Sequence, residues 1–149
     1  MQLLKINHYP QTIKVGCLAA CAQMVLRPLG ISVSQQKLHR RFDPTPIGVP
    51  FSRLRYLRNY NVQVTINQGD LSDIILAIDQ NTPPIIFLRT GELSYWQSDT
   101  QHAVVVVGYD NDDLLLNDPA FQNAPQRVLA DELMLAWDEL DNFYALLTR

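Results

Sequence analysis

The sequence predicts an α+β domain in which N-terminal helices pack on a C-terminal antiparallel sheet. Up to about residue 60 the apolar residues recur at helical spacing, whereas later they alternate with polar residues or form β-branched runs. The 149 residues are 47% hydrophobic, which suffices for one core and excludes a disordered chain. Without a repeat or a Gly/Ser linker, we expect a single domain over 1–149, helical over about 1–60 and sheet-forming over about 61–149.

Three helices are expected in the first part. One helical face holds Leu18, Ala22, Val25, Leu26 and Leu29. Gly16 is placed to begin this helix, and Pro28 with Gly30 to end it. A second helix over residues 34–42 begins at the capping residue Ser34, and a third covers residues 51–60.

The second part alternates strands with helices. We expect strands over 62–66, 85–88, 102–109, 114–117 and 143–147, and helices over 70–80 and 131–140. A polar loop, Thr90–Gln101, precedes the strand that His102 opens. Because only a short turn separates the strands over 102–109 and 114–117, they should form a hairpin whose first strand is buried on both faces.

Cys17 is the candidate nucleophile. It lies at the expected N-terminus of the first helix, where unpaired backbone N–H groups and the helix dipole favour an anion. For a cysteine this anion is the thiolate, which is the reactive form. Cys21 lies one turn further on, among small apolar residues, and is expected to be a buried core residue.

A nucleophilic cysteine needs a base and a group that orients the base. His102 begins one strand of the hairpin and Asp118 follows the other, so the two side chains can be neighbours. A carboxylate beside an imidazole fixes its tautomer and supports its charged form. Gln11 precedes Cys17, and its amide can donate to an oxyanion. Each residue also has an ordinary structural explanation, such as a hydrogen-bonded histidine or an Asp-Pro turn.

These residues lie in three stretches: QTIKVGCLAACAQMVLRPLGI, HAVVVVGYDNDDLLLNDPAFQ and DELMLAWDELDNFYALL. The stretches resemble the papain-like cysteine peptidases, and most closely the bacteriocin-processing (double-glycine leader) peptidase group. The resemblance implies the papain-like fold. It also implies that Gln11 is the oxyanion-hole residue, Cys17 the nucleophile, His102 the general acid and base, and Asp118 the orienting residue.

The residues beside Cys17 depart from that pattern. The family cysteine commonly follows a polar residue and precedes a glycine, whereas here the neighbours are Gly16 and Leu18. Leu18 would narrow the approach to the thiol, so we expect Gly16 and Leu18 to contact substrate. Trp96, on the loop before His102, is expected to form a substrate wall, although a loop aromatic can also pack on the core. No P-loop motif is present, so the nucleotide-binding part of leader-peptidase transporters is not expected.

The leading functional hypothesis is hydrolysis of a peptide or amide bond by a cysteine peptidase. Acyl transfer to an amine would use the same residues, and a non-catalytic peptide-binding module would share the fold. We expect no cofactor and no metal, because zinc sites usually need four ligands in paired spacings and His8, His39 and His102 form no pair. The expected partner is a peptide or protein substrate, with neither nucleic acid binding nor membrane insertion.

Charge is distributed unevenly along the chain. Residues 1–60 contain nine basic and one acidic side chain (net +8), and residues 61–149 contain three basic and fourteen acidic ones (net −11), which together give −3. A basic lobe can steer an anionic partner. Without a nucleic-acid motif, mutual attraction of the two halves is the favoured explanation. The N-terminus lacks signal-peptide features and no apolar stretch is long enough to span a bilayer, so a cytoplasmic location is expected.

Overall fold

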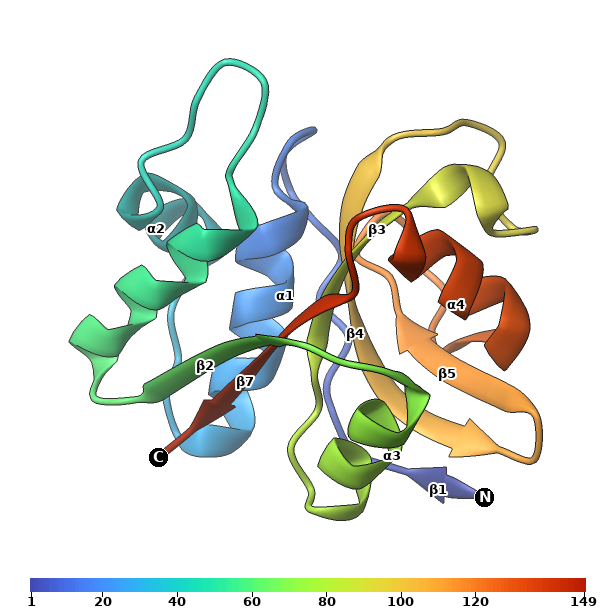
Figure 1. Cartoon of the computed structure of the whole chain (residues 1–149). Helices are drawn as coiled ribbons and strands as arrows, with labels where there is room; N and C mark the ends of the chain where they lie inside the picture. Colours follow the sequence, from blue (N-terminus) through green and yellow to red (C-terminus); the bar gives the residue numbers. More distant parts are fainter.

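A seven-stranded antiparallel sheet forms the centre of the molecule, and helices cover both of its faces (Figure 1). The computed structural model describes residues 1–149. The elements are β1 (Gln2–Leu3), α1 (Cys17–Leu26), the 3₁₀ helix η1 (Arg27–Leu29), α2 (Gln35–Arg41), the 3₁₀ helix η2 (Phe51–Tyr60), β2 (Gln63–Gln68), α3 (Leu71–Asp79), β3 (Ile85–Arg89), the 3₁₀ turn η3 (Thr90–Glu92), β4 (Gln101–Asp110), β5 (Asp113–Asn117), β6 (Gln126–Leu129), α4 (Ala130–Asp138) and β7 (Phe143–Thr148). The strand order is β2-β7-β3-β4-β5-β6, and β1 pairs with β4.

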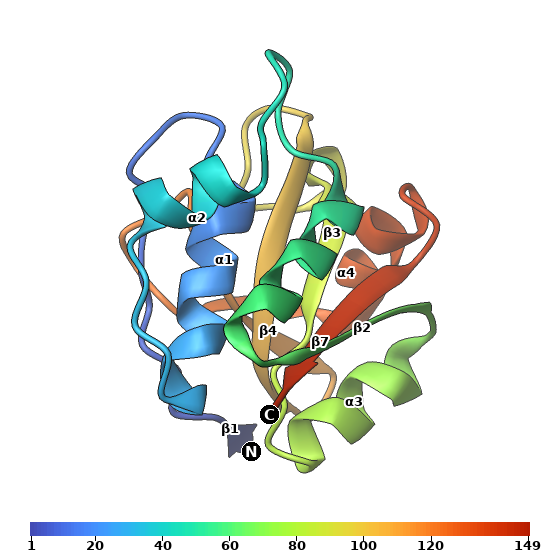
Figure 2. The same ribbon diagram turned by 90° about the vertical axis from the view of Figure 1, so that its left-hand side faces the viewer.

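Strand β4 divides the core into two layers. Its side chains alternate, so that Ala103, Val105 and Val107 join a cluster with α1, α2 and η2 on one face. Val104 and Val106 join a second cluster with α3 and α4 on the opposite face. Figure 2 shows α1, α2 and η2 together on one side of the sheet. This two-sided burial explains why the strand is a continuous β-branched run.

The predicted α+β class is confirmed, with a refinement in the first half. The first helix, α1, follows Gly16 and continues into η1, which ends where Gly30 adopts a left-handed conformation, φ 83°. Residues 51–60 form a 3₁₀ helix throughout instead of an α-helix. Their apolar residues recur at every third position, Phe51, Leu54, Leu57 and Tyr60, and a 3₁₀ helix, with three residues per turn, aligns them on one face.

Two strands were not predicted from the sequence. Strands β1 and β6 contain 2 and 4 residues, which is too short for alternation to be recognisable. Both are added to a sheet that the longer strands define. None of the helices combines the length and apolar character that crossing a bilayer requires.

Candidate active site

Three of the four sequence-predicted catalytic residues line one cavity of about 320 Å³. Gln11 comes from the segment before α1, Cys17 begins α1, and His102 lies near the start of β4. The fold therefore places the N-terminus of α1 opposite the start of β4, so that the thiol and the imidazole lie in the same cavity. Asp118 is fully buried and lies outside the cavity lining, where it contacts His102.

Cys17 is partly exposed at the first position of α1. Gly16 precedes it and offers no side-chain cap, and the carbonyl of Gly16 accepts the N–H of Ala20 as the helix begins. The N–H groups of the first turn are thus left without helical partners and favour negative charge beside the sulfur. Cys21 is fully buried, and burial raises the pKa of its thiol well above the ordinary value. Only Cys17 is placed to react.

His102 and Asp118 form a buried pair. The Nε2 atom of His102 lies 2.6 Å from Oδ1 of Asp118, which leaves Nδ1 as the nitrogen available to the thiol. Burial alone would lower the pKa of His102, but hydrogen bonding to Asp118 and Cys17 and their charges outweigh it and raise the pKa to about 9. The imidazolium form therefore persists at neutral pH.

Four donors surround the Asp118 carboxylate. Oδ1 accepts from His102 and from the backbone N–H of Ala120 at 2.9 Å. Oδ2 accepts from the Tyr95 hydroxyl at 2.7 Å and from the Trp96 indole N–H at 2.9 Å. Burial would raise the pKa of Asp118, but the bond and charge of His102 together with the other donors outweigh it and lower the pKa. The carboxylate is thus held ionised and fixed in orientation.

The structure gives Trp96 a further contact beyond the expected substrate wall. Its ring does line the cavity, but its N–H is used by Asp118 and its edge packs on the His102 ring, with centroids 4.9 Å apart. Tyr95, whose bond to Asp118 the sequence analysis did not anticipate, has its pKa raised by burial and by the Asp118 charge, so it stays a donor. The sequence did contain a signal for these two bonds. A buried carboxylate needs hydrogen-bond donors, and Tyr95 and Trp96 both carry one on the loop before the strand of His102.

The loop that carries Tyr95 and Trp96 is organised by the fully buried Thr90. The backbone N–H of Thr90 donates to the carbonyl of Thr100 at 3.0 Å, and its hydroxyl donates to the carbonyl of Ser98 at 2.7 Å. These bonds close the two ends of the loop on each other. The loop is therefore a fixed support for the Asp118 carboxylate.

The side-chain amide nitrogen of Gln11 donates to main-chain carbonyls of its own segment. The acceptors are the carbonyls of Ile13 at 3.1 Å and Lys14 at 2.9 Å, and the buried Oε1 of Gln11 has no partner. Its backbone N–H donates to the carbonyl of Pro119 at 2.8 Å, which ties this segment to the turn that holds Asp118. The side chain lines the cavity, but in this state its donors are occupied by main-chain carbonyls.

The two other expected substrate contacts differ from each other. Leu18 lines the cavity, whereas Gly16 is buried and lies outside the lining. A Cβ at Gly16 would lie 2.6 Å from a side-chain carbon of Ile13, so the glycine permits a close approach within the segment. The sequence analysis did not anticipate the cavity residues Ile47, Val49 and Phe87, and no motif marks them.

The sequence matches a family model described as the Peptidase_C39 like family over residues 3–145. The chain belongs to this family. Membership supports a cysteine peptidase function. Among curated proteins, none matches this sequence.

Solved structures share the fold of this C39-like chain at low sequence identity. A C39-like peptidase from Bacillus anthracis is 15% identical with a TM-score of 0.81, covering 100% of this chain and 98% of that one. The peptidase domain of Streptococcus ComA, a bifunctional ABC transporter, is 17% identical with a TM-score of 0.79, covering 96% and 98%. A double-glycine motif protease from an AMS/PCAT transporter, in complex with the leader peptide, is 17% identical with a TM-score of 0.73, covering 97% and 92%. The resemblance to a papain-like peptidase fold is thus confirmed.

Proposed function

We propose that this C39-like chain is a cysteine peptidase that hydrolyses a peptide bond with Cys17, His102 and Asp118. The observation that carries the proposal is the meeting of a cysteine at a helix N-terminus and a carboxylate-paired histidine in one cavity. The thiolate is the nucleophile of such an arrangement, and the histidine handles the protons.

The chemistry follows from the two protonation states of His102. The Cys17 thiolate attacks the scissile carbonyl carbon, and the imidazolium gives its proton to the leaving amine as the C–N bond breaks. A thioester and a neutral imidazole remain. The imidazole then removes a proton from water, which attacks the thioester and releases the acid and the thiolate. Asp118 keeps the ring oriented and stabilises its charged form in both steps.

The negative charge that develops on the carbonyl oxygen needs donors. Two sets of donors are available: the unpaired N–H groups of the first turn of α1, which Cys17 begins, and the amide of Gln11, which lines the same cavity. We propose that the Gln11 amide exchanges its bond to the Lys14 carbonyl for one to the oxyanion, because a charged acceptor binds an N–H more strongly than a neutral carbonyl does.

The cavity suits a short apolar stretch of peptide. Its volume is near the lower end of the range of about 300–1,000 Å³ for ligand sites, and 8 of its 14 lining residues are hydrophobic, with Lys14 adding a cation. Val49, Phe87 and Ile47 add apolar surface, and Ile47 is 96% exposed at the edge of the cavity. An exposed isoleucine that borders a cavity is a natural contact for an apolar substrate side chain.

The test is to incubate the protein with a mixture of unstructured peptides and to follow the products by mass spectrometry. Hydrolysis gives new free carboxyl termini and supports the proposal. Repeating the reaction with an added primary amine separates the alternatives, because a stable amide adduct would indicate acyl transfer. The absence of any cleavage by a protein whose Cys17 is readily alkylated would favour a peptide-binding module.

Gln11→Ala is expected to lower kcat about 10²–10³-fold, the usual cost of losing one oxyanion donor. The bonds of the Gln11 amide are local, to the carbonyls of Ile13 and Lys14, and its buried Oε1 has no partner, so the melting temperature should change little. Gln101→Ala is the matched control, since Gln101 also lines the cavity but is not proposed to contact the oxyanion. Unchanged kcat in Gln11→Ala would show that the amide remains bound to its own segment during turnover.

A further inference from the structure

Across the two halves of the chain the one ion pair joins the Met1 amino group to Asp110 at 3.9 Å. None of the nine Lys and Arg side chains of residues 1–60 forms an ion pair, and the Arg pairs of the structure all lie within residues 61–149. Any attraction between the two halves therefore acts at longer range than a direct contact between these side chains and carboxylates. The two η2 arginines, Arg55 and Arg58, thus have no carboxylate partner within the chain, and Arg58 donates to the carbonyl of Val64 at 3.4 Å.

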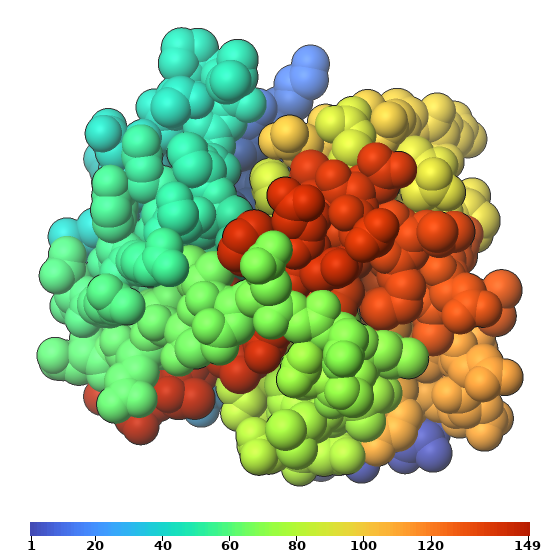
Figure 3. All heavy atoms as spheres, viewed as in Figure 1, coloured from blue at the N-terminus to red at the C-terminus, as the bar shows by residue number.

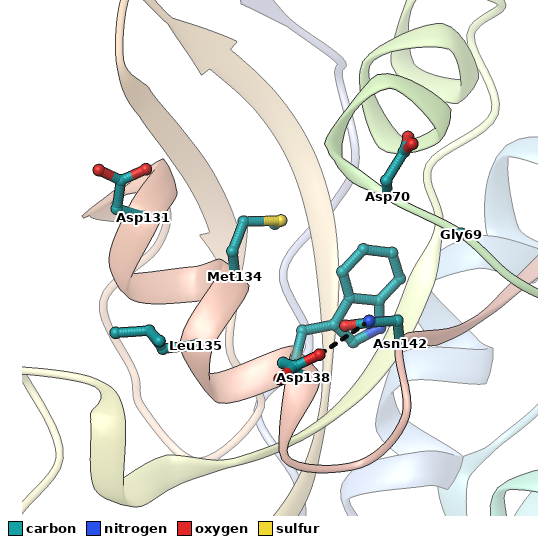
Figure 4. A pocket seen from close by; sticks show the side chains of 8 residues that line it. Gly69, Asp70, Asp131, Met134, Leu135, Asp138 and Asn142 are labelled. Atoms are coloured by element: carbon teal, nitrogen blue, oxygen red, sulfur yellow. Dashed lines mark hydrogen bonds between the residues drawn. The ribbon is translucent and has the colours of Figure 1, made fainter.

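The acidic half contains a groove with an apolar floor between α3 and α4. Asp70, Asp131 and Asp138 border it, and Met134, Leu135 and Trp137 supply apolar surface in a volume of about 450 Å³. Figure 4 shows Met134 reaching from α4 towards the N-terminal end of α3, with the labelled carboxylates around it. Leu135 is 59% exposed. We call this surface the acidic groove, and no cation lines it.

The basic half presents a complementary ridge on η2. Because the 3₁₀ helix turns every three residues, its apolar row faces the core and Arg55 and Arg58 share an outward row. Tyr56, 41% exposed, lies in the neighbouring row, where Arg53 packs over its ring. We call Arg55, Tyr56 and Arg58 the basic ridge. Tyrosine and arginine are, with tryptophan, enriched at the energetic centres of protein interfaces.

Figure 3 shows one face of the molecule with the η2 segment (residues 51–60) on the left and α4 (red) on the right. A two-fold axis that runs along this face between them brings each surface of one copy opposite the other surface of the second copy. Each contact then pairs arginines with aspartates around an aromatic and apolar centre.

We propose that this face associates two copies of the chain, with the basic ridge of each copy bound in the acidic groove of the other. A second copy is the occupant that the charges favour, because one chain carries both complementary surfaces and pairs neither internally. The contact lies away from the Cys17 cavity, whose lining shares no residue with the groove. The proposal therefore does not depend on the peptidase function.

The first experiment is sedimentation velocity of the full chain over a range of concentrations and salt. We expect a monomer–dimer equilibrium that shifts to monomer as salt rises from about 0.02 M to about 1 M, because the Debye length falls to about 3 Å and the charge pairs are screened. A monomer at every concentration and salt overturns the proposal. A dimer that is insensitive to salt also overturns it.

Charge reversal then locates the interface. Arg55→Glu with Arg58→Glu should weaken association at least roughly tenfold, and so should Asp131→Lys with Asp138→Lys, because like charges then face each other. Mixing the two variants should restore a dimer, since both contacts are again between opposite charges. Dimers that form in each variant alone, or a mixture that stays monomeric while both variants remain folded by circular dichroism, would contradict the proposal.

Matched control variants make the same change in net charge at other positions on the surface. Lys5→Glu with Arg27→Glu changes exposed basic residues outside η2, and Glu92→Lys with Asp112→Lys changes exposed acidic residues outside the groove. Both controls should dimerise as the wild type does at moderate salt. Equal loss of association in the controls would mean that total charge, and not this face, governs it.

Discussion

Cys17→Ala is expected to lower peptide hydrolysis by about 10⁶-fold, the size of the loss when the nucleophile of a triad enzyme is removed. Cys21 cannot replace Cys17 as the nucleophile, because Cys21 is fully buried and burial raises the pKa of its thiol. The melting temperature should stay close to that of the wild type, because Cys17 is partly exposed. Initial rates on the best peptide from the mixture measure the effect.

Cys21→Ala is the matched control for the nucleophile. Cys21 is one helical turn away and its side chain fills a buried site, so its replacement should cost some stability and leave kcat near the wild-type value. If Cys17→Ala retained most of the activity, or if Cys21→Ala alone abolished it in a folded protein, Cys17 would not be the nucleophile.

Asp118→Asn is expected to lower kcat by about 10⁴-fold, as when the orienting residue of a triad is removed. The substitution is not conservative here, because each carboxylate oxygen accepts from two donors. Wherever the new NH₂ points, it meets a group that can only donate: the Trp96 indole on one side or the Ala120 backbone N–H on the other. The unsatisfied contact should also cost about 1–3 kcal/mol of stability.

Kinetics and chemical denaturation of Asp118→Asn test both expectations together. Asp99→Asn is the control. Asp99 lies on the loop that carries Tyr95 and Trp96, but it is exposed and accepts from Arg89 and the backbone N–H of Gly91. It should stay within about 0.5 kcal/mol of the wild type. A fully active Asp118→Asn protein would show that the carboxylate does not orient His102 during catalysis.

The sequence was most informative where local rules fix geometry. A cysteine after Gly16 at the start of an apolar helical face had to lie at a helix N-terminus, and it does. A hairpin with a short turn had to bring the start of one strand near the end of the other, which explains why His102 and Asp118 are neighbours. The two-faced burial of β4 also followed from its unbroken β-branched run.

What could not be predicted depends on loops and on contacts between distant segments. Nothing local places the loop of Ile47 beside Cys17, because that contact depends on how η2 and α2 pack against α1. The direction of the Trp96 and Tyr95 side chains depends on the Thr90 bonds that close their loop. The amide of Gln11 turns to nearby carbonyls, an arrangement that residue type alone does not reveal.

The most direct test of the central claim is the rate at which iodoacetamide alkylates each cysteine at about pH 6, where an ordinary thiol is almost wholly protonated. Because the pKa of His102 is raised to about 9, its imidazolium is present at this pH to stabilise a thiolate. Peptide mass spectrometry locates the label, and His102→Gln, whose amide can still donate to Asp118, serves as the comparison. The account predicts fast labelling at Cys17, slow labelling at Cys21, and loss of the Cys17 advantage in the variant. Equally slow labelling of both cysteines, or fast labelling of Cys17 that His102→Gln leaves unchanged, would contradict an activated Cys17–His102 pair.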